Sequence, residues 1–241
     1  VENLKKHGSL ARKYLQSRDI SDSTIEKFSL GYSLDSFSAL KSYLQKNHIN
    51  DEIMKDCGLF KVKDDKVYDM FRDRLMFPIA NTAGKIVAYG ARALTAEQEK
   101  QGKYINSPTS PIYTKGNELY GLNNSRFEIS KKKASIIVEG YMDFLRMWES
   151  GFHHVVASLG TALTENQVQI LGRYSSQFLM LYDGDKAGRN AAVKAAAIIL
   201  KKGYSVKIVS IPNNDDPDSF LRNHPPAEMD NLIANALPLP E

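Results

Sequence analysis

The sequence predicts an α/β fold, in which a mostly parallel sheet flanked by helices follows a mixed α+β region. In the second half of the chain, short apolar runs rich in β-branched residues alternate with helical patterns. Such runs suit strands that are buried on both faces, and regular alternation of strand and helix is typical of parallel sheets. The first half lacks this alternation, because helical patterns come first and short strands joined by tight turns follow.

The first half is predicted to begin with helices over residues 1–60, where Ser21–Ser23 offers capping residues. Two hairpins should follow. Their turn signals are Asp64–Asp65 and Asn81–Gly84, both rich in residues that tolerate left-handed backbone. The polar stretch 100–111 contains Gly and two Pro, and it is predicted to be a long loop.

The second half is predicted to repeat a strand followed by a helix. The strands are expected at 135–138, 153–158, 177–182 and 206–211. Helices are expected over 141–150, from Thr164 onward, and from about Ala187 to Gly203. Gln167 completes a capping box with Thr164, which marks the start of the second of these helices.

Carboxylates stand where these predicted strands end. They are Glu139, Asp183, Asp185, Asp216 and Asp218. Because parallel strands end at one edge of a sheet, the five side chains should share a rim, which is where ligands bind in open α/β sheets. Carboxylates this close repel one another unless cations neutralise them, and Mg²⁺ prefers oxygen ligands. The pattern therefore predicts a metal-dependent site for phosphate chemistry.

Each of these carboxylates also has a structural interpretation. Glu139 and Asp185 each precede a predicted helix and would stabilise its N-terminus. Asp216 followed by Pro217 is a routine helix start, and the capping and metal-binding roles are expected to coexist there. Asp143, one helical turn after Glu139, is expected to support the site or to lie in solvent.

The chain resembles the RNA polymerase core of bacterial DnaG-type primases, which contains a Toprim module with a strand-end Glu and a later Asp-x-Asp. The resemblance covers nearly the whole chain. The acidic stretches that carry it are Ser-Ile-Ile-Val-Glu-Gly-Tyr-Met-Asp (135–143), Leu-Tyr-Asp-Gly-Asp (181–185) and Asn-Asp-Asp-Pro-Asp (214–218). The other matching stretches are residues 71–79, 89–94, 103–108, 113–122 and 157–164.

The resemblance implies synthesis of short RNA primers on single-stranded DNA from nucleoside triphosphates, with two or more Mg²⁺ or Mn²⁺ ions as cofactors. It implies a catalytic role for Glu139, Asp183 and Asp185. The same three residues are implied to bind metal together with Asp216 and Asp218, with Asp143 in a supporting role. No side-chain nucleophile is required, since the metal ions would activate the 3′-hydroxyl and stabilise the triphosphate.

The resemblance also implies nucleotide and template contacts in the first half. The nucleotide-binding residues would be Lys103, Tyr104, Asn106, Ser107 and Lys115. The template-binding residues would be Arg72, Arg74 and Arg92. The alternative for each arginine is an ion pair that serves the fold, and Asp73 is a ready partner for its two neighbours. The resemblance further implies inhibition by guanosine tetra- and pentaphosphate alarmones, which a site that contacts phosphates through charged groups would bind.

Three regions are expected from the resemblance. Residues 1–114 would form a basic α+β subdomain for template binding, 115–237 the Toprim catalytic subdomain, and 238–241 the start of a following region. The nascent primer would be a further partner. A replicative helicase and single-strand-binding protein would be engaged through domains outside this chain, and a family zinc module is not expected within it. The alternatives are another Toprim enzyme, such as a topoisomerase or nuclease, and a non-catalytic nucleic-acid-binding module.

Composition agrees with these expectations. The net charge of +4 conceals an asymmetry, because residues 1–133 carry 23 Lys and Arg against 16 Asp and Glu, and residues 134–241 carry 9 against 12. A half that binds a polyanion and a half that binds cations would account for it, as would a chance excess of solvated lysines. No apolar run approaches the roughly 20 residues that span a bilayer. The single Cys57 excludes an internal disulfide, which favours a reduced, cytoplasmic compartment. The resemblance implies a bacterial, nucleoid-associated protein.

Overall fold

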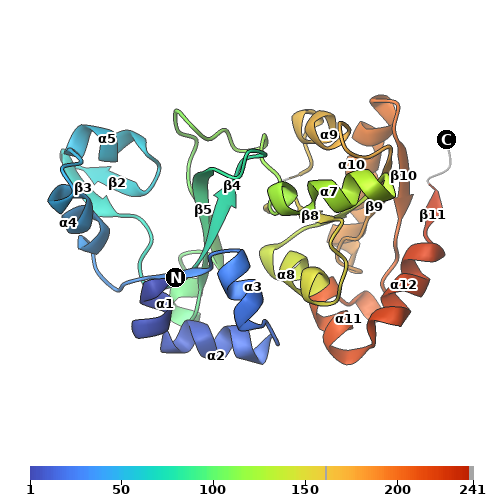
Figure 1. Cartoon of the computed structure of the whole chain (residues 1–241), viewed down its shortest axis with the longest axis horizontal. Coiled ribbons are helices and arrows are strands. Elements are labelled where there is room, and N and C mark those ends of the chain that lie inside the picture. Colours follow the sequence, from blue (N-terminus) through green and yellow to red (C-terminus); the bar gives the residue numbers. More distant parts are fainter. Residues whose placement is uncertain (161, 239–241) are drawn as a thin grey trace. The chain divides into compact units, whose positions relative to one another are not determined.

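The computed structural model describes residues 1–160 and 162–238 of the chain and divides it into two compact units (Figure 1). The first unit contains Val1–Ser17, Ser21–Ala80 and Lys85–Lys115. The second unit contains the rest of the described chain, including the short segments Arg18–Ile20 and Asn81–Gly84 from the first half. The main division thus falls between residues 115 and 116, and two short segments of the first half belong to the second unit.

The helices of the first unit are short. They are α1 (Glu2–Lys6), α2 (Ser9–Ser17), α3 (Asp22–Lys27), α4 (Ala39–Lys46), α5 (Asp51–Asp56) and, later, α6 (Ala96–Glu99). The Ser21 side chain caps α3 by accepting a hydrogen bond from the Thr24 N–H at 3.2 Å, as the capping signal predicted. No helix in the described part of the chain is long and apolar enough to cross a membrane.

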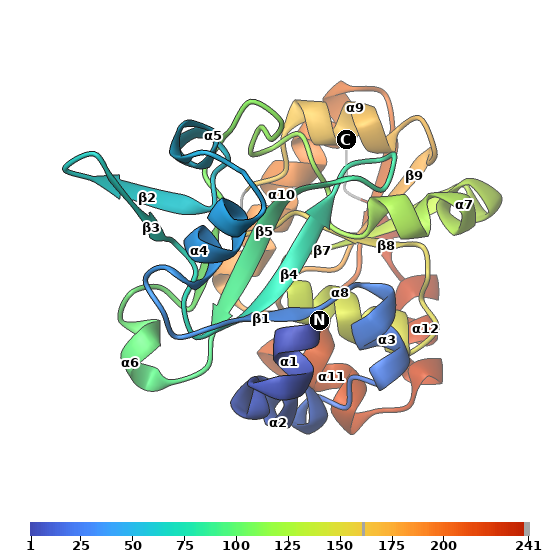
Figure 2. The same ribbon diagram turned by 60° about the vertical axis from the view of Figure 1, so that its left-hand side comes forward.

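The strands of the first unit form an antiparallel sheet and a separate hairpin. The sheet has the order β1 (Gly31–Ser33), β4 (Arg74–Ala80), β5 (Ile86–Ala93) and β6 (Tyr104–Asn106), and Figure 2 shows β4 and β5 running side by side. The hairpin consists of β2 (Phe60–Lys63) and β3 (Lys66–Asp69). Its turn residues Asp64 and Asp65 have φ values of 48° and 58°, which is the left-handed backbone that a tight hairpin requires.

Both predicted hairpins are confirmed, and two other expectations for this unit are wrong. The segment predicted as wholly helical contains β1, which pairs with β4. The predicted loop contains β6, which pairs with β5. Each of these strands has only three residues, so neither carries a periodic pattern, and long-range pairing with a longer strand stabilises it.

The second unit is a mostly parallel sheet with helices, as predicted. Its strands are β7 (Ala134–Val138), β8 (Val155–Ala157), β9 (Gln177–Met180), β10 (Ser205–Ile208) and β11 (Leu237–Pro238). Its helices are α7 (Leu122–Lys132), α8 (Tyr141–Glu149), α9 (Glu165–Leu171), α10 (Lys186–Lys201), the 3₁₀ turn η1 (Pro212–Asn214), α11 (Pro217–Asn223) and α12 (Pro226–Ala234). The sheet order is β11-β10-β9-β7-β8, and only the short β11 is antiparallel to its neighbour.

The tail differs from expectation, because β11 places residue 238 in the sheet of the second unit rather than in a following region. Residues 239–241 lie outside the described residues. The strands of the second half are otherwise found where predicted, and β8, β9 and β10 are shorter than their predicted runs. The run 206–211, for example, contributes only Ser205–Ile208 to β10.

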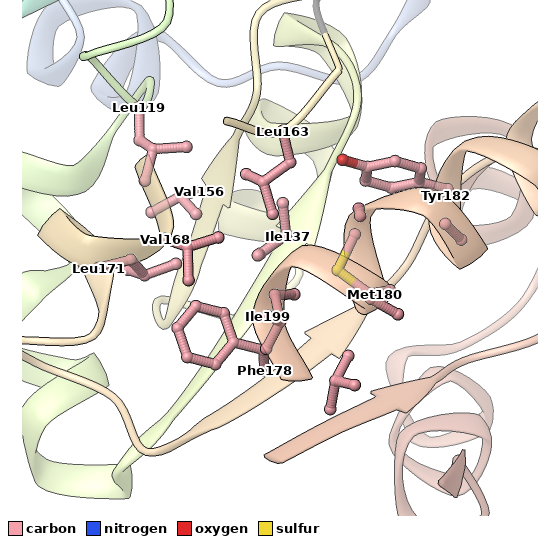
Figure 3. Close-up of a cluster of buried hydrophobic side chains, with 14 of the residues drawn as sticks. Leu119, Ile137, Val156, Leu163, Val168, Leu171, Phe178, Met180, Tyr182 and Ile199 are labelled. Atoms are coloured by element: carbon pink, nitrogen blue, oxygen red, sulfur yellow. The ribbon is translucent and has the colours of Figure 1, made fainter. Parts of the chain in front are cut away.

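The core of the second unit lies between the sheet and three helices. Figure 3 shows Ile137 and Phe178 of the central strands packed with Val168 of α9 and Ile199 of α10. Ile136 and Val138, whose side chains point to the opposite face of β7, are also 0% exposed. Both faces of the central strand are therefore covered, which explains why its sequence is continuously apolar.

Substitution of Gly121 should destabilise the second unit strongly. Gly121 precedes α7 with φ of 80°, and a Cβ at this position would lie 2.1 Å from the ring of the buried Phe144. The Gly121→Ala variant should lose about 3 kcal/mol or more of unfolding free energy, from strain in the left-handed region plus overpacking. Gly151→Ala is the matched control, because Gly151 has φ of 90° and no atom within 4 Å of the added Cβ. Urea unfolding of both variants measures the difference, and equal losses would contradict the packing argument.

Candidate functional site

Glu139 and Asp183 meet at the carboxyl edge of the parallel sheet. Ile137 of β7 pairs with Met180 of β9, so the two strands end side by side. The Glu139 carboxylate accepts a hydrogen bond from the Asp183 N–H at 3.2 Å. Burial raises the pKa of Glu139 above its ordinary value and the charge of Asp185 adds to this, while the bond from the Asp183 N–H opposes it. The structure thus brings together the ends of the first two acidic stretches.

Asp143 lies beside this pair in the first turn of α8. Its carboxylate accepts a hydrogen bond from the Gly140 N–H at 3.1 Å, which satisfies a free donor at the helix N-terminus. Burial, and to a lesser extent the charges of Asp183, Asp216 and Asp218, together raise the pKa of Asp143 to about 8, although the bond from the Gly140 N–H opposes this. These carboxylates are therefore close enough to repel one another.

Asp185 and Asp216 are both helix N-caps. Asp185 accepts a hydrogen bond from the Gly188 N–H at 2.7 Å and begins α10. Asp216 accepts one from the Ser219 N–H at 2.6 Å and begins α11, with Pro217 in the first helical position. The capping interpretation is confirmed for both residues. Capping uses one carboxylate oxygen of each residue, and a carboxylate has acceptor capacity beyond that bond.

Asp218 has a different environment from the other four carboxylates. It is 2% exposed, and Arg18 Nη1 forms a close ion pair with its carboxylate. The Nε atoms of Arg146 and Arg222 each lie 3.6 Å from a carboxylate oxygen of Asp218. Arg146 also donates to the carbonyl of Arg18. The charge of Asp218 is therefore balanced by arginines, so its predicted metal-binding role has a strong structural competitor.

These arginines were not predicted from the sequence. Arg146 offered a signal, since it interrupts the apolar run from Phe144 to Trp148 on α8 and is itself 7% exposed. A buried arginine requires an anionic partner, and the partner here lies on another helix. Arg18 offered no local signal, because its partner is 200 residues away in the sequence.

The acidic residues offer carboxylate oxygens, which are the ligands that hard divalent cations prefer. All are carboxylates, and the raised pKa values of Glu139 and Asp143 indicate negative charge that lacks a counterion. Among the described residues, no three His, Cys, Asp or Glu side chains converge closely enough to hold an ion by themselves.

The predicted nucleotide-binding residues all belong to the first unit, and Lys115 is the last residue of that unit. Lys103 and Lys115 have exposed side chains. Tyr104 and Asn106 lie on β6, where they pair with Arg92 and Gly90 of β5 and so share one face of the sheet. Ser107 is 2% exposed, and its hydroxyl accepts a hydrogen bond from the Tyr89 N–H at 3.1 Å. Ser107 therefore closes the sheet, which leaves it poorly placed to contact a nucleotide.

Two of the three predicted template-binding arginines are built into the fold. Arg74 is 4% exposed and donates to the carbonyls of Gln98 and Gly102 at 3.1 and 2.8 Å. Arg92 is 8% exposed, and its guanidinium lies 4.0 Å from the centre of the Tyr14 ring. Arg92 also forms an ion pair with Glu99 at 3.9 Å, as the structural alternative proposed, whereas among the described residues Arg74 forms no ion pair with Asp73. Arg72 is more accessible and stacks 3.6 Å above the ring of Phe37.

Comparison with known proteins agrees with this architecture. A family described as the DNA primase catalytic core, N-terminal domain, matches residues 1–126, and a Toprim-like family matches residues 136–221. The first match covers more than half of the chain. The chain belongs to the DNA primase catalytic-core family. The resemblance predicted from the sequence is therefore confirmed.

Relatives of the primase family cover almost the whole chain. The DNA primase of Pasteurella multocida is 40% identical over 235 residues, which are 96% of this chain and 40% of the relative. The Escherichia coli primase catalytic core is 32% identical with a TM-score of 0.90, covering 99% of this chain and 77% of that one. A DnaG primase catalytic domain solved with single-stranded DNA has a TM-score of 0.88 at 32% identity, covering 99% of this chain and 75% of that one. The chain spans about two fifths of the length of the curated relatives it matches.

The titration of Asp143 should make stability depend on pH when no metal is present. A raised pKa favours the folded state fully below the ordinary Asp value of about 4, and this contribution is lost as pH rises through about 8. Asp143→Asn should therefore gain stability over the parent protein as pH rises, by more than about 1 kcal/mol at pH 8. Urea unfolding in chelator from pH 5 to 9 measures this, with the exposed Asp230→Asn as control. Parallel pH curves for parent and Asp143→Asn would rule the coupling out.

Removal of the Asp218 charge should destabilise the second unit whether or not metal is present. Asp218→Asn removes the buried anion that faces Arg18, Arg146 and Arg222, and leaves the buried Arg146 with only the more exposed Asp19 as a recorded anionic partner among the described residues, which should cost about 3 kcal/mol. Thermal unfolding with and without Mg²⁺ distinguishes this role from metal binding. A metal ligand would give a loss of stability that appears only when Mg²⁺ is added, and that result would contradict the ion-pair assignment.

Proposed function

We propose that this chain is the catalytic core of a DNA primase, which synthesises RNA primers on single-stranded DNA by metal-dependent nucleotidyl transfer. The observation that carries the proposal is the meeting of Glu139 and Asp183 at the carboxyl edge of the sheet, with a raised pKa at Glu139, in a chain of the primase core family. Partly buried carboxylates that repel one another are suited to hold cations at a site of phosphate chemistry.

Glu139, Asp183, Asp185 and Asp216 are the residues proposed to hold Mg²⁺ or Mn²⁺. When bound, the cations would neutralise triphosphate charge and lower the pKa of the attacking 3′-hydroxyl. The proposed role of the protein is to fix the four carboxylates at strand and helix ends, where the rigid sheet and the capping bonds hold them. Asp218 is proposed to contribute indirectly, because its arginine partners hold the start of α11.

The proposed substrates are nucleoside triphosphates and a single-stranded DNA template. Lys103 and Lys115 have exposed ammonium groups that suit phosphate oxygens, and alarmones would compete through the same chemistry. Among the predicted template contacts, Arg72 is the best supported, since Arg74 and Arg92 donate to carbonyls of the fold. The likeness to a primase catalytic domain solved with single-stranded DNA supports this choice of template.

The other candidate functions have less support. A Toprim topoisomerase or nuclease would share the second unit, but the match over residues 1–126 is to primase cores. A non-catalytic nucleic-acid-binding module would not require the acidic pair of Glu139 and Asp183, and both residues are in place.

Glu139→Gln tests the proposed function, because it removes the charge at almost constant shape. The full-length variant should keep its thermal stability and lose primer synthesis by about a hundredfold or more, which corresponds to about 2.7 kcal/mol of transition-state stabilisation. Incorporation of labelled nucleotide on single-stranded DNA with Mg²⁺ is the measurement. Asp230→Asn is the control, because it removes one exposed carboxylate outside the site. Undiminished synthesis by a folded Glu139→Gln protein would refute the proposal.

A further inference from the structure

The loop that carries Asp183 and Asp185 packs directly on the loop that leads to Asp216. The residue between the two aspartates is Gly184, and its N–H donates to the Asp215 carbonyl at 2.8 Å. A Cβ on Gly184 would lie 2.9 Å from the Ile211 carbonyl oxygen and 3.1 Å from that of Asp215. The second and third acidic stretches are therefore in backbone contact, and a glycine is required for that contact.

One side chain bridges these two loops. Arg189 lies on α10, one turn after the N-cap residue Asp185. Its Nη1 atom donates to the Gly184 carbonyl in one loop and to the Asn214 side-chain oxygen in the other, the latter at 3.1 Å. Arg189 also lines the small hollow between the two loops, together with Tyr182, Gly188 and Ser210.

The loop that Arg189 holds has an unfavourable backbone. Asn213 and Asn214 have φ values of 60° and 56°, in the left-handed region that asparagine tolerates better than most residues. Two consecutive residues in this region persist only where the surroundings fix them. Asp216 follows two residues later, so the conformation of this loop sets where its carboxylate lies.

The guanidinium of Arg189 forms hydrogen bonds to neutral acceptors rather than ion pairs with the carboxylates. Its acceptors are a backbone carbonyl and an amide oxygen, and within the described residues it forms no ion pair. This contrasts with Arg146, whose guanidinium faces the carboxylate of Asp218. An arginine that joins the two acidic loops without neutralising them leaves their charge available for cations.

We infer that Arg189 is a positioning residue, which holds the Asp216 loop against the Asp183–Asp185 loop so that the carboxylates can share divalent cations. The inference rests on the proposed function, because it assigns a purpose to a residue beside that metal site. It can be tested because the charge of Arg189 and its positioning role have opposite effects on cation affinity. Removal of a positive charge near a cation site should tighten cation binding by Coulomb attraction alone, whereas loss of positioning should weaken it.

The test is Mn²⁺ binding, measured by titration with detection of free Mn²⁺ by electron paramagnetic resonance. Arg189→Met removes the bridge and the charge but keeps the aliphatic stem, and it should weaken Mn²⁺ binding about tenfold. Arg189→Lys keeps the charge without the fork that reaches both loops, and it should also bind Mn²⁺ more weakly. Lys194→Met is the matched control, because Lys194 is an exposed cation on the same helix. Binding by Arg189→Met that equals or exceeds that of the control would overturn the inference.

Asn214→Ala provides a second route that does not alter any charge. If Arg189 acts through the loop, Arg189→Met should weaken Mn²⁺ binding much less in the Asn214→Ala background than in the parent protein. Equal and additive losses would overturn the inference, as would a failure of Asn214→Ala to weaken binding. If the parent protein and its Asp183→Asn variant bind Mn²⁺ equally, the proposed metal site itself fails. Retained Asp183-dependent binding with no effect of Arg189 refutes only the positioning role.

Discussion

The second unit depends on one constraint. Strands that are buried on both faces exclude polar side chains, so these side chains lie at the strand ends. β7 and β9 are continuously buried, so the first polar side chains after them lie at the same edge of the sheet. That edge is where Glu139 and Asp183 meet. The same packing that makes the core stable therefore concentrates negative charge, and the raised pKa of Asp143 is the electrostatic consequence.

The protein treats its buried carboxylates in two ways. Asp218 is surrounded by arginines, so its charge is balanced and it serves to connect α8, α11 and the segment Arg18–Ile20. In the part of the chain that the structure describes, no arginine pairs with Glu139 or Asp143, and burial raises the pKa of both carboxyl groups. Motif spacing assigned all five strand-end carboxylates to one metal site, whereas the environments of the side chains separate Asp218, in an ion-pair network, from Glu139, whose pKa is raised by burial.

Local signals were sufficient to predict most of the second unit and part of the first. Capping residues such as Thr164 and Asp216 and the turn at Asp64–Asp65 act through neighbours in sequence, so their effects could be inferred directly. β1 and β6 could not, because three-residue strands depend on pairing with distant partners. The contacts of Arg74 and Arg92 were equally hidden, since a guanidinium buried in a fold and one that binds DNA look alike in sequence.

The placement of Arg18–Ile20 in the second unit has a consequence for how the chain folds. Arg18 is synthesised long before its partner Asp218, which follows 200 residues later in the chain. The loop that this contact closes is long, so closing it costs conformational entropy before the ion pair can stabilise the closed loop. The network around Asp218 should therefore form late, after the central strands have assembled. The order in which the chain folds thus leaves the start of α11, and with it Asp216, among the last parts of the second unit to become fixed.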